Sequence, residues 1–168
     1  MDSVIGKLRE WAVGPYEITK ETGPLLVDKI RFRHYKPDEL EIAKEFVRRA
    51  LVPGIYFFDV YLPTTEVKKA IEALPKEYKR IAYPGMLRID AVCLKGKTIW
   101  IIEFKERFRP TGIGELMTYK RLFIREYKPK KDVILAYVSS RHDPDLERVL
   151  QDYGIIGYVV TPRAGKYA

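Results

Sequence analysis

Three side chains within residues 88–108 have the types and spacing needed to hold a metal ion beside a positive charge. Asp90 lies in the run RIDAVCLK, and the apolar run TIWIIEFK ends on Glu103 and Lys105. A two-residue turn at Gly96-Lys97, with Gly in the first central position of a type II′ turn, makes Asp90 face Glu103. Opposed residues of a strand pair share one face, with Cβ atoms about 4.5–5.5 Å apart. Period-two alternation places Lys105 on that face too, so the sequence predicts two carboxylates and an ammonium side by side.

Opposed carboxylates destabilise a sheet unless a proton or a cation compensates them. Mg²⁺ prefers carboxylate, carbonyl and water oxygens, so Asp90, Glu103 and the carbonyl of Phe104 are candidate ligands, with Mn²⁺ as a substitute. Such an ion polarises a phosphodiester and lowers the pKa of a bound water, while Lys105 orients that water or neutralises the phosphate. The alternative interpretation makes Asp90 an ordinary polar residue near a turn and Glu103–Lys105 an ordinary ion pair.

The elements that must position these residues are clearest from Pro37 onward. Apolar spacing predicts a helix from Pro37-Asp38 to Pro53-Gly54, and β-branched and aromatic runs predict strands. The predicted helices cover residues 37–50, 64–74, 112–127 and 144–152, and the predicted strands cover 55–61, 86–94, 98–105, 133–138 and 155–160. In the first 36 residues only Leu25 to Val27 indicates a short strand. This order predicts one α/β domain, a mixed central sheet flanked by helices.

Three sequence blocks together resemble the PD-(D/E)xK nuclease superfamily. The blocks are RIDAV around Asp90, IIEFK around Glu103 and Lys105, and GIGELMTYKRL, in which Glu115 and Tyr119 share one helix face. The resemblance covers residues 37–138, although Ile89 replaces the motif's proline and Gln is more usual than Glu at position 115. The superfamily includes restriction endonucleases, Holliday-junction resolvases and nuclease domains of recombination helicases.

The resemblance implies a restriction-endonuclease-like fold and Mg²⁺-dependent hydrolysis of DNA. It makes Asp90, Glu103, Lys105, Glu115 and Tyr119 the expected catalytic residues. Residues 37–168 are then the nuclease domain, and residues 1–36 an N-terminal extension packed on it. The family often adds an acid from the first helix as a further ligand. Candidates are Glu39, Glu41 and Glu45, of which Glu45 is preferred. Asp59 is another candidate, with the alternative role of partner to an arginine.

The charge balance favours a polyanionic partner. The chain has 31 Lys and Arg against 23 Asp and Glu, a net charge of +8 and a pI near 9.4. Residues 105–131 hold many of these cations. The expected nucleic-acid-binding residues are Arg88, Arg107, Arg109, Lys120 and Arg121. Basic residues at 68–80, before the turn at 83–85, extend this set, and a solvated helix surface is the alternative for each.

Several other site classes are disfavoured. The single Cys93 excludes an internal disulfide and a multi-cysteine zinc site and is expected in the core. His34 and His142 are expected at the surface, and no phosphate-binding loop motif is present. No signal peptide or membrane span is recognisable, so we expect a cytoplasmic protein.

The expected partner is DNA, with a homodimer or a larger DNA-processing complex if both strands are cut. Two alternatives stay open. One is a catalytically silent nucleic-acid-binding module of the same fold, and the other is an unrelated basic α/β domain.

Overall fold

The computed structural model describes residues 3–79 and 86–163. Its α-helices are α1 (Ser3–Trp11), α2 (Gly23–Leu26), α3 (Pro37–Arg48), α4 (Thr65–Glu72), α6 (Pro110–Tyr127) and α7 (Pro144–Asp152). Its strands are β1 (Val13–Ile18), β2 (Gly54–Tyr61), β3 (Arg88–Lys95), β4 (Thr98–Phe104), β5 (Asp132–Ser139) and β6 (Ile155–Val159). Short 3₁₀ turns cover Val27–Lys29 and Lys76–Tyr78. The predicted turn at 83–85 and Arg80 lie outside the described residues.

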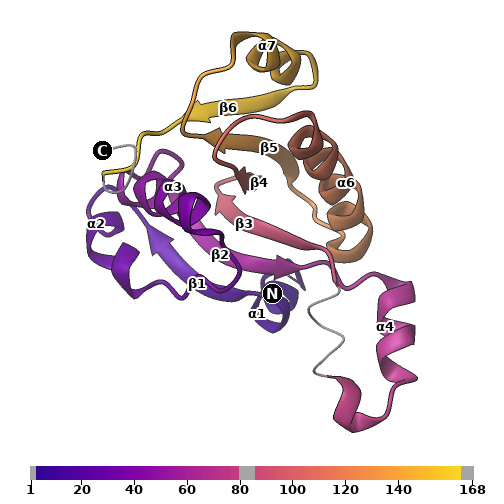
Figure 1. Ribbon diagram of the computed structural model, residues 1–168. Helices are drawn as coiled ribbons and strands as arrows, with labels where there is room; N and C mark the ends of the chain where they lie inside the picture. The colour runs from indigo at the N-terminus through magenta and orange to yellow at the C-terminus, as the bar shows by residue number, and fades with distance from the viewer. Residues whose placement is uncertain (1–2, 80–85, 164–168) are drawn as a thin grey trace.

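The six strands form one mixed sheet in chain order, β1 to β6 (Figure 1). The pairs β1–β2, β2–β3 and β3–β4 are antiparallel. From β4 onward the pairing is parallel, because α6 crosses from β4 to β5 and α7 from β5 to β6. The prediction of one α/β domain with a mixed sheet and flanking helices is therefore confirmed.

Each face of the sheet has its own apolar core. Leu8 of α1, Phe123 of α6 and Leu150 of α7 pack on one face. Ile42 and Phe46 of α3 pack on the other. Helix α4 buries none of its side chains and projects away from the sheet in Figure 1. Among the described residues, no helix is both long and apolar enough to cross a membrane.

From Pro37 onward the predicted helices and strands are confirmed to within a few residues. The first 36 residues differ. The strand predicted at Leu25 to Val27 is wrong, because Gly23-Pro24 opens α2 and a 3₁₀ turn follows. No sequence pattern in this segment predicted α1 or β1. Strand β1 reads VGPYEI, and a proline is tolerated there because β1 is an edge strand with an irregular register.

The predicted β3–β4 register is confirmed from the turn up to the pair Ala91–Ile102. Gly96 has the positive φ (56°) that the predicted turn requires. Beyond Ala91 the regular pairing of β3 with β4 ends. The alternation of side chains between the two faces of the sheet is also interrupted there. Val92 and Ile89 lie in the same core although they are three positions apart, an odd spacing that regular alternation would place on opposite faces. The break falls at Asp90 and at Asp59, its counterpart by register on β2, where the backbone adopts a φ of 50°.

Candidate active site

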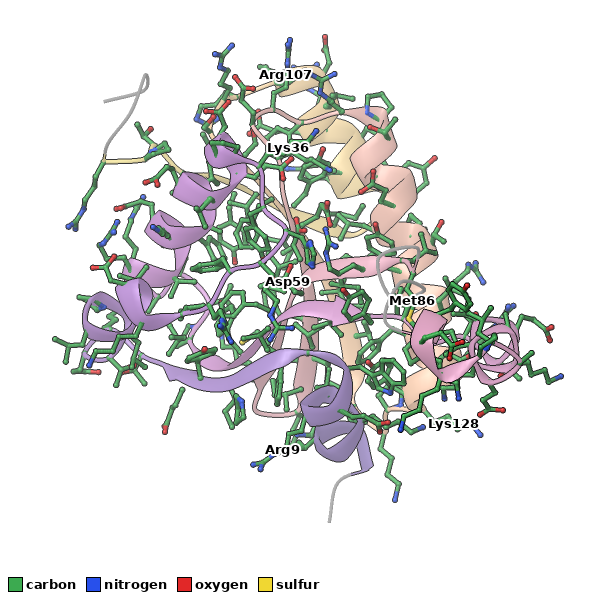
Figure 2. All side chains as sticks on the ribbon, turned by 60° about the horizontal axis from the view of Figure 1, so that its bottom comes forward. Arg9, Lys36, Asp59, Met86, Arg107 and Lys128 are labelled. Carbon is green, nitrogen blue, oxygen red and sulfur yellow. The ribbon has the colours of Figure 1, made fainter. Side chains whose placement is uncertain are left out.

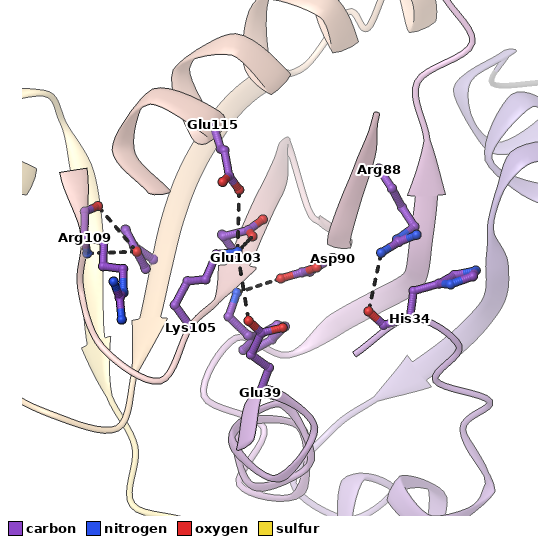
Figure 3. Close-up of polar contacts among 10 residues, drawn as sticks. His34, Glu39, Arg88, Asp90, Glu103, Lys105, Arg109 and Glu115 are labelled. Atoms are coloured by element: carbon purple, nitrogen blue, oxygen red, sulfur yellow. Dashed lines mark hydrogen bonds and ion pairs between the residues drawn. The ribbon is translucent and has the colours of Figure 1, made fainter. Parts of the chain in front are cut away.

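Three carboxylates converge on one ammonium at the end of β4. The Nζ atom of Lys105 lies 3.3 Å from Glu103, 3.7 Å from Glu115 and 4.0 Å from Glu39 (Figure 3). These acids come from β4, α6 and α3, so the cluster joins the sheet to the helices of both faces. The Glu103 side chain is only 4% exposed and Lys105 is 26% exposed. The cluster therefore lies at the mouth of a buried site.

The local fold explains this convergence. The backbone N–H of Lys105 donates to the carbonyl of Val138, so the chain continues beside β5 after β4 ends. Glu103 and Tyr119 face the core between the sheet and α6. Glu115 lies one turn before Tyr119 on the same helix face, as the sequence predicts. Strand alternation and helix periodicity thus turn Glu103, Glu115 and Tyr119 toward the same side of the sheet.

Asp90 reaches the cluster from β3. One of its carboxylate oxygens accepts a hydrogen bond from the backbone N–H of Phe104, at 2.9 Å. The hydroxyl of Tyr35 donates to the backbone carbonyl of Asp90. Asp90 is held by β4 on one side and by the segment before α3 on the other. The site therefore includes Tyr35, which the sequence analysis did not select, because its neighbours give no motif that links it to Asp90.

Burial and neighbouring negative charges perturb the two central carboxyls. Burial, together with the charge of Glu39, raises the pKa of Asp90 to about 7, although the Phe104 N–H opposes the shift. Burial and the charge of Asp90 raise the pKa of Glu103 well above its ordinary value, and Lys105 only partly offsets this. Each carboxyl thus favours a proton or a cation nearby, which is the electrostatic environment of a metal ligand.

Lys105 remains an ammonium in this environment. Burial lowers the pKa of Lys105, but the charges of Glu103, Glu115 and Glu39 outweigh it, and the net shift is upward. Burial and the charge of Glu103 also raise the pKa of Tyr119, so its phenol stays protonated at neutral pH. Both groups are therefore hydrogen-bond donors, and Lys105 does not act as a general base in this state.

The donor set suits an ion that keeps most of its water. Oε2 of Glu103 is buried and accepts no hydrogen bond from any described residue. Within residues 3–79 and 86–163, no group of three or more Asp, Glu, His or Cys side chains is arranged to hold a metal. Mg²⁺ commonly binds through one or two carboxylates, with waters and substrate phosphate completing the shell. Asp90 and Glu103 fit this pattern, and the role of the Phe104 carbonyl stays a prediction.

The structure brings Glu39 to the cluster instead of the preferred Glu45. Glu45 pairs with Arg48 on its own helix, and Arg163 lies 3.4 Å away. The two glutamates are six residues apart, which places them about 120° apart around the helix. Glu39 points toward Lys105 and Glu45 toward the C-terminal segment. Of the candidate acids of the first helix, the geometry therefore favours Glu39 over the preferred Glu45.

Asp59 has the alternative role that the sequence analysis left open. Its carboxylate lies 3.4 Å from Nε of Arg88 and accepts a hydrogen bond from the backbone N–H of Arg33. Arg88 also donates to the carbonyl of His34, at 3.4 Å (Figure 3). Burial raises the pKa of Asp59, while the Arg33 N–H and Arg88 lower it. Asp59 thus positions Arg88 beside Asp90 and does not join the carboxylates around Lys105.

The other predicted nucleic-acid-binding residues do not all lie near the cluster. Arg109 precedes α6 and lies on the Lys105 side of the cluster, and Arg107 is exposed nearby (Figures 2 and 3). Lys120 and Arg121 lie further along α6, where no described contact joins them to the cluster. Of these predicted residues, Arg107 and Arg109 therefore lie near the site, and the roles of Lys120 and Arg121 stay predictions.

The side chains of the two histidines and the cysteine take no part in the site. Cys93 is buried in the core, as expected. His142 is exposed and lies 3.1 Å from Glu147. His34 is exposed and meets Arg88 only through its backbone carbonyl. The chemistry of the site therefore rests on carboxylates, a lysine and two tyrosines.

No family model, curated protein or solved structure matches the chain. Its function is therefore inferred from the side chains and geometry of the site.

Proposed function

We propose that the protein is a Mg²⁺-dependent nuclease that hydrolyses DNA phosphodiester bonds. The observation that carries this proposal is the meeting of Asp90, Glu103 and Lys105, with one buried oxygen of Glu103 lacking a hydrogen-bond donor among the described residues. Burying two carboxylates together costs stability, so such an arrangement indicates a functional requirement. A hydrated cation and a phosphate are the partners that satisfy this set of charges.

Each residue of the site has a role in this proposal. Asp90 and Glu103 hold the ion, and the N–H of Phe104 fixes the Asp90 carboxylate. Bound Mg²⁺ polarises the phosphodiester and lowers the pKa of a bound water. Lys105, as an ammonium, donates to the phosphate or to the attacking water. Glu115 and Glu39 orient Lys105 through their ion pairs. Mn²⁺, which accepts the same oxygen ligands, is expected to replace Mg²⁺.

A second candidate function is a catalytically silent nucleic-acid-binding module. The observation that favours it is the ammonium of Lys105, which lies among three carboxylates and already compensates part of their charge. In that case the cluster would serve as a structural ion-pair network. Nucleic acid would then bind through the basic surface without any requirement for a divalent ion.

Cleavage assays separate the two functions. Supercoiled plasmid and single-stranded DNA are incubated with the purified protein in Mg²⁺, Mn²⁺ or EDTA, beside an Asp90→Asn variant. The nuclease requires a divalent ion and loses activity by about 10²-fold or more in the variant. Cleavage that persists in EDTA or in the variant would rule out the assigned site. Salt-sensitive binding without cleavage would favour the silent module.

The products also report on assembly. A single active site nicks one strand, whereas linear plasmid formed without a nicked intermediate requires two sites acting together. We propose a homodimer, or a complex with other DNA-processing proteins, for the second case. Sedimentation of the protein with and without DNA would show which assembly forms.

A further inference from the structure

A cavity of about 340 Å³ adjoins the catalytic cluster and shares two of its residues, Glu39 and Lys105. The start of α3 forms one wall, with Lys36, and the start of α6 forms the other, with Arg109 and Thr111. Figure 2 shows Lys36 between the ribbons of these helices, and Figure 3 shows Arg109 beside Lys105. The cavity therefore extends the site on the side away from Asp90 and Arg88.

The two outer cations are available to a ligand. Lys36 and Arg109 are both exposed, and neither forms an ion pair with any residue that the structure describes. Each is the residue preceding its helix, and neither side chain caps that helix. The charge of each side chain is thus free to meet an anion.

Each acid of the cavity has an interaction within the protein. Glu39 shares the ammonium of Lys105 with two other carboxylates. Glu106 lies 3.6 Å from Arg141, and Asp38 also has an interaction within the protein. Lys36 and Arg109 consequently dominate the charge that faces an incoming ligand. The positive ends of two helices add to this preference for an anion.

The wall at α6 is rigid. The hydroxyl of Tyr137, a buried residue of β5, accepts a hydrogen bond from the backbone N–H of Arg109 at 3.0 Å. The next turn packs Gly112 directly against the same ring. The backbone of Arg109 is therefore held at a fixed place relative to Lys105, because β4 and β5 are paired up to Phe104 and Val138. An anchored backbone lowers the entropy cost of bringing the exposed Arg109 side chain onto a phosphate.

We propose that this cavity binds the phosphate group next to the one that is cleaved, through Lys36, Arg109 and the Thr111 hydroxyl. This inference rests on the proposed nuclease function. The ligand is an internal phosphodiester or a terminal phosphomonoester of the nucleic-acid strand, which share the same oxygen acceptors. The strand then extends from Arg88, past Asp90, Glu103 and Lys105, to Lys36 and Arg109.

The test is a double-mutant cycle between protein and DNA. A short oligonucleotide carries one neutral methylphosphonate, moved one phosphate at a time along the strand, and cleavage is measured in Mg²⁺. The protein variants are Lys36→Ala/Arg109→Ala and a charge-matched control, Lys29→Ala/Lys97→Ala, in which both replaced residues are exposed and neither lines the cavity.

For the wild-type protein, the methylphosphonate beside the cleaved bond should lower cleavage about tenfold. The Lys36→Ala/Arg109→Ala variant should cleave unmodified DNA about tenfold less and lose little more with that methylphosphonate, because the contact is already gone. The control variant should behave as the wild type. Additive effects, or a cavity variant no different from the control, would overturn the proposal.

Two further arms complete the test. Oligonucleotides with and without a terminal phosphate distinguish the two sources of the group. If the cavity binds a terminal phosphomonoester, removing that phosphate removes the contact, whereas a contact with an internal phosphodiester persists. The same double-mutant cycle is repeated with binding affinity in place of the cleavage rate. Affinity is measured in EDTA by fluorescence anisotropy, so this result does not depend on cleavage. If the wild type cleaves nothing but the binding cycle shows coupling, the nuclease function fails and the phosphate site stands. Absence of coupling in binding would overturn the site as well.

Discussion

Lys105 determines the charge balance of the site. Its ammonium lies within 4.0 Å of three carboxylates, of which Glu103 is almost fully buried. In the absence of a metal, this ammonium is the cation nearest to the Glu103 carboxylate among the described ion pairs. A metal ion bound by Glu103 would share that carboxylate with Lys105. The stability of the metal-free protein and its affinity for metal are therefore coupled through one side chain.

Lys105→Met should separate the two effects. At pH 8 without metal, the variant should lose about 1–3 kcal/mol of unfolding free energy, because a buried carboxylate loses its partner. Mg²⁺ should restore more stability to the variant than to the wild type, since it replaces the missing charge. DNA cleavage should fall by about 10²-fold or more.

Thermal unfolding with and without Mg²⁺ measures the stability of the Lys105→Met variant and of the wild type. Lys97→Met, at the exposed hairpin turn, is the control. A variant as stable as the wild type, or one that gains no more from Mg²⁺, would contradict the role given to Lys105.

The perturbed carboxyls predict how metal-free stability depends on pH. The pKa of Asp90 is about 7 in the folded protein against an ordinary value of 3.8, so the folded state retains a proton that the unfolded state has released. This contribution to stability is present below about pH 4 and is lost as the pH rises through 7. Glu103 shifts in the same direction.

The melting temperature in EDTA should therefore fall between about pH 4 and pH 7, and Asp90→Asn should flatten this dependence. Asp132→Asn, at an exposed position, is the control. An Asp90→Asn protein with the full wild-type pH dependence would show that Asp90 is not the group responsible.

At the scale of elements, the contact between α6 and β5 determines where Glu115 and Arg109 lie. Gly112 lies in the first turn of α6, and a Cβ at this position would overlap the ring of Tyr137. Tyr137 is fully buried and cannot move aside. A Cβ added at Gly114, two residues later, would meet no atom within 4 Å. Substitutions of these two glycines therefore test whether the close packing of α6 on β5 matters to the site.

Gly112→Ala should destabilise the protein by about 1–3 kcal/mol and reduce cleavage, because the start of α6 is forced away from β5 and Glu115 from Lys105. Gly114→Ala should instead raise stability by about 0.5–1 kcal/mol, since alanine is the better helix former. Chemical denaturation and cleavage rates measure both. Equal effects of the two substitutions would contradict the close packing.

For the whole molecule, the net charge of +8 favours binding to a polyanion. Cations of the segment before α3, of β3 and of the start of α6 border the site. Contact with about five phosphates gives an affinity that falls as about the 4.5 power of salt concentration. Electrostatic contact of this kind requires no particular base sequence.

DNA binding by the Asp90→Asn variant in EDTA should follow this salt dependence, with a slope of about 4–5 in a plot of log Kd against log salt. The added substitutions Lys36→Ala/Arg109→Ala should lower the slope by about 2, because two phosphate contacts are lost. Titrations at several NaCl concentrations measure the slope. A slope below about 1 would exclude the basic surface as the main binding determinant.

Features that depend on local geometry could be predicted from the amino-acid sequence alone. A two-residue turn sets the β3–β4 register, and strand alternation then places Glu103 and Lys105 together. Helix periodicity places Glu115 and Tyr119 on one face of α6. These features follow from residues close together in the chain, so no distant contact is needed to predict them.

The distant groups that complete the site are set by tertiary packing. Glu39 rather than Glu45 reaches Lys105, because the rotation of α3 over the sheet follows from how Ile42 and Phe46 pack. Tyr35 meets the carbonyl of Asp90 although 55 residues separate them. The edge strand β1 forms because β2 offers a free edge, and its own sequence is a weak strand former. Contacts between remote segments depend on the packing of the whole domain, which local residue patterns do not encode.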